Sequence, residues 1–127
     1  MKVLPPSGLI LVLLVLVGAC RPSGVVLEGV DQKAWKQDRM GCLGLRQGQL
    51  DNLEAAWPQL QGLSQNEIMT TLGKPDQHEL YLRSQKFFVY YVDPAPACDT
   101  TLVNPPLRIH IRFNAMGYAN ELTRRNY

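Results

Sequence analysis

The spacing of apolar residues changes at one point in this chain, and that change restricts the fold more than any other feature. Before Pro75, apolar residues recur three or four positions apart, which places them on one face of a helix. After Pro75 they alternate with polar residues, most clearly over 107–113, as in a half-buried strand. This order predicts an α+β fold (ααβββ). Two helices would pack on one face of a three- to four-stranded antiparallel sheet.

The second predicted helix carries signals at both of its ends. Ser64 and Glu67 have the spacing of a capping box, in which each side chain bonds the backbone amide of the other residue. Gly73 stands where a left-handed residue ends a helix, and Pro75 prevents the helix from continuing. We therefore expect a helix over about 65–72.

An earlier helix is expected over about 46–60. Pro58 removes a backbone donor within it, so we expect a kink or an early stop near Trp57. The apolar face of this helix would consist of Leu45, Leu50, Leu53, Ala56, Trp57 and Leu60.

Four segments after Pro75 have strand character. They cover residues 78–83, 87–92, 107–113 and 118–123. Residues 93–106 contain four prolines and predict a long loop, and Gly117 supplies the left-handed position of a hairpin turn. The segment 87–92 is apolar on both faces, as expected of a central strand.

The start of the chain has the pattern of an export signal. Lys2 precedes an unbroken run of nine apolar residues, Leu9 to Val17, whereas a membrane-spanning helix needs roughly 20. The following Val17-Gly18-Ala19-Cys20 resembles the lipobox of bacterial lipoproteins, in which the cysteine is acylated and becomes the new N-terminus. We therefore expect a signal peptide at 1–19, a lipidated tether at 20–34 and a domain at 35–127, which begins with an extended strap. The resemblance, with Arg21 rather than Asp after the cysteine, implies a periplasm-facing anchor in the outer membrane.

The three cysteines of the chain differ in their expected chemical state. If Cys20 carries lipid, Cys42 and Cys98 are left as a pair in an oxidising envelope, which predicts a disulfide. The alternatives are two free thiols, or a metal site that includes His78 or His110, although no CxxC or HxxxH motif is present.

Charge and composition exclude some classes of function. The 13 basic and 11 acidic side chains give a net charge of +2, without the basic excess typical of nucleic-acid binders. Two histidines and three cysteines argue against a scaffold with several metal ligands. We expect no cofactor, no nucleic-acid partner and no small-molecule substrate.

One stretch of the chain resembles a known family. Its elements are Gly62-Leu63-Ser64-x-x-Glu67-Ile68-x-x-x-Leu72-Gly73-x-Pro75, an aromatic strand, and Phe113-Asn114-x-x-Gly117. In this order they resemble the SmpA/OmlA (BamE-like) family of small outer-membrane lipoproteins, over about residues 62–122. The strap at 35–46 and the loop that carries Cys98 are not part of the family pattern.

The resemblance implies a function without catalysis. Family members are accessory subunits of the machinery that inserts β-barrel proteins into the outer membrane, and they bind partner proteins. The resemblance implies the same architecture here, with a membrane attachment through Cys20 and partners among envelope proteins.

The strands offer a candidate partner surface. His110 alternates outward with its neighbours Arg108 and Arg112, which predicts either a solvated face or a basic face for an acidic partner or anionic lipid. Tyr91, with Phe87 and Val89, lies on the sheet face opposite to Phe88, Tyr90 and Val92. Whichever set does not pack on the helices would be covered by the strap or would form an exposed aromatic patch. The candidate surface comprises Tyr81, Tyr91, Arg108, His110 and Arg112.

Two alternative functions remain to be weighed. A concave sheet face lined by Tyr81, Tyr91, His110 and Arg112 would instead favour an inhibitor-like or ligand-binding module. A catalytic set could be drawn from Ser64, Asp76 and one histidine, but Ser64 is better explained as a helix cap and no nucleophile elbow is present, so we predict no enzyme.

Overall fold

The computed structural model describes residues 24–126, which form an α+β fold with the helices ahead of the sheet along the chain. The helices are α1 (Gln32–Gln37), α2 (Leu50–Ala55), α3 (Trp57–Leu60) and α4 (Gln65–Leu72), with 3-10 turns at Arg39–Gly41, Gln47–Gln49 and Leu82–Ser84. The strands are β1 (Gln77–Tyr81), β2 (Gln85–Tyr91), β3 (Arg108–Phe113) and β4 (Ala119–Arg125). They pair antiparallel in the order β1-β2-β3-β4, so the predicted fold class is confirmed. The predicted signal peptide at 1–19 and Cys20 lie outside the described residues.

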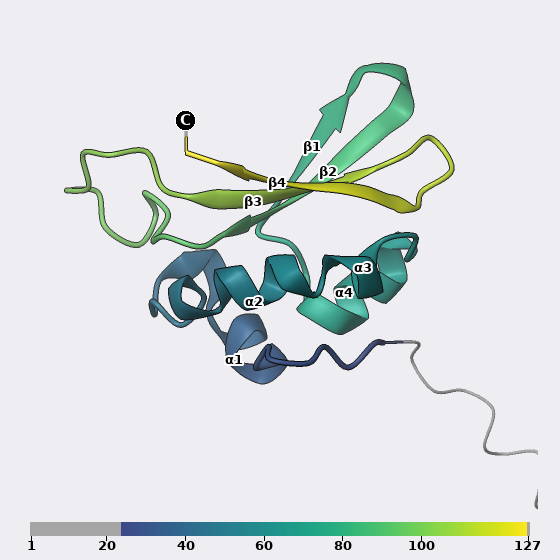
Figure 1. Ribbon diagram of the computed structural model, residues 1–127. Coiled ribbons are helices and arrows are strands. Elements are labelled where there is room, and N and C mark those ends of the chain that lie inside the picture. Colours follow the sequence, from purple (N-terminus) through teal and green to yellow (C-terminus); the bar gives the residue numbers. More distant parts are fainter. Residues whose placement is uncertain (1–23, 127) are drawn as a thin grey trace, which may run out of the picture.

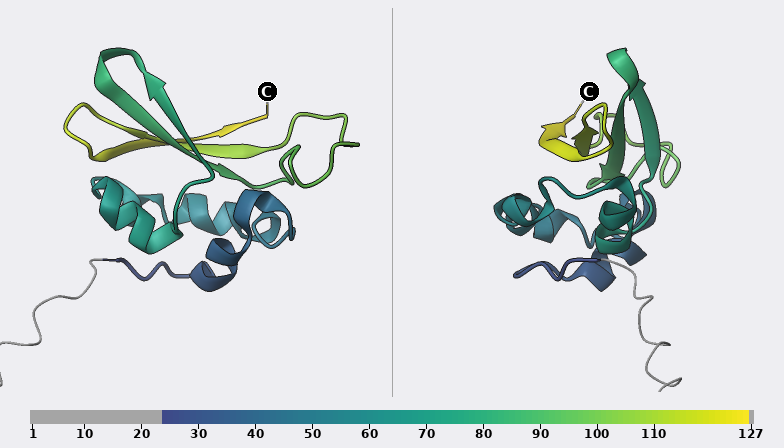
Figure 2. Two further views of the ribbon diagram at one scale, coloured as in Figure 1. Left: turned by 180° about the vertical axis from the view of Figure 1, so that it is seen from behind. Right: turned by 90° about the vertical axis from the view of Figure 1, so that its right-hand side faces the viewer.

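The helices pack against one face of the sheet, which we call the inner face (Figure 1). Its buried side chains are Phe88, Tyr90, Ile109, Ile111 and Phe113. Arg124 of β4 also joins the two layers, because its guanidinium contacts the carboxylates of Asp51 and Glu54 on α2. The far end of the β1–β2 hairpin rises beyond the helices in all three views, and Leu80 there is 81% exposed (Figures 1 and 2).

The helix α4 has the predicted bounds and the predicted caps. The Ser64 side chain accepts a bond from the Glu67 amide at 3.2 Å, and the Glu67 carboxylate accepts one from the Ser64 amide. Gly73 ends the helix with φ 84°, a conformation that costs glycine less than any other residue.

The helix expected over 46–60 stops early, at Ala55, so the predicted interruption near Trp57 is confirmed. A 3-10 turn precedes α2, and the chain breaks at Ala56 before α3, which has Pro58 in its first turn. A proline there needs no amide partner, so the chain starts a new helix instead of bending the old one. Leu45 was expected on the buried face but is 42% exposed, because it precedes the first turn.

Residues 25–34 pack against the rest of the protein, so the prediction of a flexible tether is wrong for this part of the segment. Leu27 and Val30 are buried, and α1 begins at Gln32 after an Asp31 cap. The side-chain nitrogen of Gln32 donates to the Val25 carbonyl at 2.9 Å. The side-chain oxygen of Gln32 accepts from the backbone amide of Leu27 at 2.8 Å. The strap beyond it is also not extended, since it continues α1 and forms a 3-10 turn.

Candidate functional site

The sheet face opposite to the helices is the candidate partner surface, and we call it the outer face. Strand register places its residues in three rows across the sheet. One row is Glu79, Phe87, Arg112 and Glu121; the next is Gln77, Val89, His110 and Thr123; the third is Tyr91, Arg108 and Arg125. Among the described residues, no helix lies against this face (Figure 2).

The aromatic residues of the outer face are buried by cationic side chains. The guanidinium of Arg108 lies 5.8 Å from the ring centroid of Tyr91, and that of Arg125 lies 5.6 Å from the ring centroid of Phe87. Phe87, Val89 and Tyr91 are all less than a tenth exposed. An exposed aromatic patch is therefore not formed. The strap's turn at Arg39–Gly41 lies against the Tyr91 end of β2, and long basic side chains shield apolar surface with their stems.

A hollow of about 310 Å³ crosses the first row of the outer face. It is lined by Glu79, Leu80, Phe87, Arg112, Glu121 and Arg125. Inside it Arg112 donates to the Glu121 carboxylate at 2.8 Å, so these two charges are paired. Of the predicted surface residues whose side chains the structure describes, Arg112 lines the hollow, whereas Tyr91, Arg108 and His110 do not.

His110 lies on the outer face but is only 2% exposed, so the prediction of a solvated position is wrong. Its Nδ1 is 3.7 Å from the Glu79 carboxylate, and its ring meets the Phe87 ring edge-on at 5.8 Å. Neither ring nitrogen has a hydrogen-bond partner among the described residues. Burial lowers the pKa of His110, helped by Arg125 and Arg108 and opposed by Glu79. The imidazole is therefore held in its neutral form.

The other predicted site residues have structural roles or lie at the margin. Tyr81 pairs through its backbone with Gln85 at the end of β1, and its side chain lies outside the described part of the structure. Gly117 forms the β3–β4 turn with φ 88°, and its amide donates to the Asn114 carbonyl. Pro75 is buried just after α4. The family-motif residues thus shape the junction of the helices and the sheet instead of the outer face.

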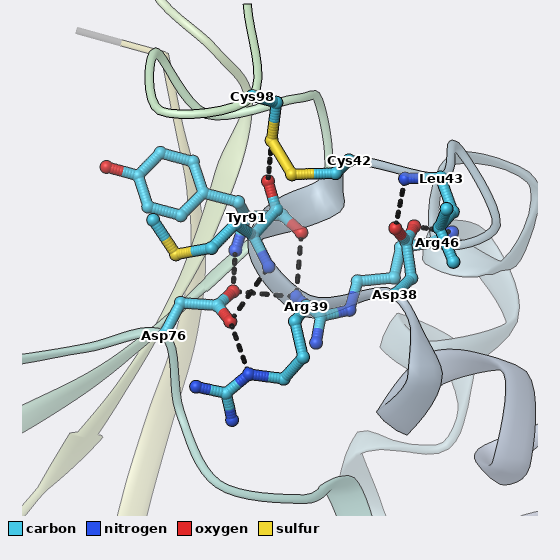
Figure 3. The surroundings of a disulfide bond; sticks show 9 residues. Asp38, Arg39, Cys42, Leu43, Arg46, Asp76, Tyr91 and Cys98 are labelled. Carbon is cyan, nitrogen blue, oxygen red and sulfur yellow. Dashed lines mark hydrogen bonds and ion pairs between the residues drawn. A yellow bond between two sulfur atoms is a disulfide. The ribbon is translucent and has the colours of Figure 1, made fainter.

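A buried charged network near the disulfide has no counterpart in the sequence analysis (Figure 3). Arg46 donates to the Asp76 carboxylate at 2.7 Å, and both side chains are almost fully buried. Asp76 also accepts from the backbone amides of Met40, at 3.1 Å, and Tyr91, at 2.8 Å. Both charges have the several partners that a buried ion pair needs.

Aromatic and acidic groups complete this network around Arg46. Its guanidinium lies 4.9 Å from the ring centroid of Trp35 and 5.6 Å from that of Tyr90, on opposite sides of the helix–sheet interface. The Asp38 carboxylate accepts from the amides of Leu43, at 2.6 Å, and Arg46, at 2.9 Å (Figure 3). No periodicity marks these residues, because their burial arises only when distant segments meet.

The predicted disulfide between Cys42 and Cys98 is present, with a Cα–Cα distance of 5.4 Å. It joins the loop after α1 to the long β2–β3 loop. The same two segments are also joined by a hydrogen bond from the side-chain nitrogen of Gln47 to the Asp93 carboxylate, at 3.0 Å. Free thiols and a cysteine metal site are therefore excluded in this form of the protein.

The residues of the alternative catalytic set are each engaged separately. Ser64 caps α4, Asp76 belongs to the Arg46 network, and His78 is exposed on β1. Over residues 24–126 there is no group of three His, Cys, Asp or Glu side chains that could hold a metal ion. The same residues include no helix long and apolar enough to cross a membrane.

Comparison of the chain with protein-family models, with curated proteins and with solved structures finds no match.

Proposed function

We propose that this chain is a non-enzymatic, lipid-anchored envelope protein of the SmpA/OmlA (BamE-like) type, which binds a partner protein through the outer face of its sheet. Its membrane attachment is the lipid on Cys20, and its setting is outer-membrane β-barrel assembly or envelope integrity. The observation that carries the proposal is the outer face itself. There three arginines cover or flank buried aromatic residues around a hollow of about 310 Å³.

The chemistry of this face is suited to protein recognition. Arginine and aromatic side chains dominate the energetics of protein interfaces, because they combine large contact area with directional bonding. An envelope protein with an acidic docking segment would fit best, since Arg108, Arg112 and Arg125 outnumber Glu79 and Glu121.

The position of the first described residues supports this use of the outer face. Residues 24–31 and α1 lie on the side of the helices away from the sheet (Figures 1 and 2). Gly24 is four residues from Cys20, a length that spans at most about 14 Å. A lipid on Cys20 would therefore hold the helical side near the membrane and leave the outer face directed away from it.

Site-specific photo-crosslinking in cells tests the docking face. A photoreactive residue at Thr123, in the middle row of the outer face, should give an adduct with an envelope protein, whereas one at Asn52 on the helical side should not. Arg112→Glu should abolish the Thr123 adduct, and Lys86→Glu, which has the same charge change on the other face, should preserve it. Equal adducts from both positions would contradict the proposal.

The anchor is tested separately with Cys20→Ser. The variant should lack the lipid mass on its N-terminal peptide and should leave the membrane fraction. If the variant partitions with membranes as the natural chain does, the lipobox interpretation fails whatever the outer face binds.

The ligand-binding alternative is favoured by one observation, the hollow itself. A volume of about 310 Å³ is at the lower limit for a small-molecule site. An inhibitor-like or ligand-binding periplasmic module would show a saturable ligand-induced rise in melting temperature that Arg112→Glu removes. A partner adduct without any such ligand would favour the docking function.

A further inference from the structure

A basic surface distinct from the outer face lies on the helical side, and we define it as Lys33, Lys36, Arg39 and Lys74. All four side chains are exposed. Lys33 and Lys36 are three positions apart on α1 and so share one of its faces. The stem of Lys36 packs close to Gly73, the residue before Lys74, and the Arg39 guanidinium donates to the Lys74 carbonyl at 2.9 Å. The four residues therefore form one cluster, although 41 positions separate the first from the last.

The Arg39 guanidinium lies 3.8 Å from the buried Asp76 carboxylate, whereas the charges of the three lysines of this cluster are not neutralised by the described residues. Lys33, Lys36 and Lys74 form no ion pair with any described residue. Two carboxylates in the neighbouring sequence, Asp38 and Asp76, are buried and are occupied by the Arg46 network. The described residues as a whole carry equal numbers of basic and acidic side chains, 11 of each, so this surface is a local excess.

The cluster lies next to the point where the chain leaves toward Cys20. The side-chain nitrogen of Gln32, at the start of α1, donates to the backbone carbonyls of both Val25 and Thr71 at 2.9 Å. The Val25 amide donates to the Thr71 hydroxyl at 3.1 Å. These bonds join the exit of the tether, the start of α1 and the end of α4, where Lys74 follows.

We propose that this basic surface docks on the anionic phospholipid headgroups of the membrane that holds the anchor. The inference rests on the proposed lipidation of Cys20, because a tether of at most about 14 Å keeps this side of the domain near the bilayer. One lipid signal with an adjacent basic patch is a known way to strengthen and orient a membrane attachment. Each basic side chain near an anionic surface strengthens binding roughly fivefold. The docked domain would hold its outer face toward the periplasm.

Lysine acylation in vesicles tests this surface without altering the protein. The lipidated protein, purified from membranes, is reconstituted into vesicles of phosphatidylcholine alone or mixed with phosphatidylglycerol. A water-soluble acylating reagent then labels the lysines, and mass spectrometry gives the rate for each. Lys33, Lys36 and Lys74 should react more slowly in the anionic vesicles, whereas Lys86 on the β1–β2 hairpin should not change. High salt should remove the protection, because it screens the charges.

Paired charge reversals provide the matched control, with Lys74 as the reporter. Lys33→Glu with Lys36→Glu should weaken docking at least roughly 30-fold and return Lys74 to its rate in neutral vesicles. Arg83→Glu with Lys86→Glu makes the same charge change on the hairpin and should leave Lys74 protected. Equal melting temperatures would show that both variants fold.

Three outcomes would overturn the proposal: equal labelling in the two kinds of vesicle, equal protection of Lys86, or continued protection of Lys74 in the Lys33→Glu, Lys36→Glu variant. The mass of the N-terminal peptide reports the lipid independently. If that lipid is absent, the anchor fails alone, and salt-sensitive protection of freely added protein still decides whether the lysines bind anionic lipid.

Discussion

At the scale of single residues, two buried ionisable side chains differ in whether they have hydrogen-bond partners. The buried Asp76 carboxylate is bound by Arg46 and by two backbone amides. His110 has no hydrogen-bond partner for either nitrogen within the described residues, and so it keeps its neutral form. The first group contributes stability through its partners, while the second makes stability depend on pH.

Removal of the Asp76 carboxylate should be strongly destabilising. Asp76→Ala leaves the guanidinium of Arg46 buried without a counter-charge, and breaking such a pair costs about 3–5 kcal/mol. The free energy of unfolding, from urea denaturation followed by circular dichroism, should fall by that amount. Lys86→Ala, an exposed position, should change it by less than about 0.5 kcal/mol. A small effect of Asp76→Ala would mean that water replaces the carboxylate.

Acid should destabilise the protein through His110. The pKa of His110 in the folded protein lies below the ordinary value of 6.5. Below pH 6.5 this histidine therefore binds a proton more readily in the unfolded chain than in the folded protein. The free energy of unfolding should therefore fall as the pH drops from 6.5 to the folded-state pKa. His110→Leu should remove this part of the slope, measured by urea denaturation at a series of pH values. An unchanged slope would show that other groups cause the acid sensitivity.

At the scale of elements, α4 and its neighbours depend on local signals that the sheet then uses. The capping box starts the helix, and Gly73 and Pro75 turn the chain toward β1. Gly73 also lies against the stem of Lys36, so the end of α4 packs directly on α1. A fault in this one helix end would disturb both layers.

The capping box should be measurable on its own. Ser64→Ala removes the acceptor for the Glu67 amide and should lower the free energy of unfolding by about 1 kcal/mol. Ser64→Asp should retain most of the stability, because aspartate also caps well. Thermal and urea unfolding of the two variants provide the comparison. Equal losses in both would show that the hydroxyl packs and does not cap.

At the scale of the whole molecule, a covalent link and a buried ionic link both join the segment after α1 to the sheet. The disulfide connects it to the β2–β3 loop, and the Arg46 network connects it to β2. The network needs no particular redox state. Loss of the disulfide should thus reduce stability without removing the fold.

The double variant Cys42→Ser, Cys98→Ser tests this division. The closed loop has a sequence separation of 56, for which chain entropy predicts a loss of about 4 kcal/mol. The variant should melt at a lower temperature and still show cooperative unfolding and an unchanged far-ultraviolet spectrum. Adding Arg46→Ala to it should abolish cooperative unfolding. A double variant that is already unfolded would show that the network alone cannot hold the segment.

Predictions from the sequence succeeded where the deciding contacts lie within a few residues. The caps of α4 and the Gly117 turn are both of this kind, whereas β3 was expected to be half-buried and is buried at three successive residues, 109–111. The prediction failed for residues 25–34, which pack through the side-chain amide of Gln32 and not through an apolar period. The lipid anchor and the partner remain predictions, since Cys20 lies outside the described residues.

The sequence by itself determined the fold class and the capped helix, and it predicted the disulfide while leaving free thiols and a metal site as alternatives. Only the tertiary structure decided that Arg46 meets Asp76 from 30 positions away and that His110 is buried on the outer face. It also decided that Lys74 joins the lysines of α1. Local patterns depend on backbone geometry and short-range bonding, whereas burial and charge clusters arise when distant segments exclude water together.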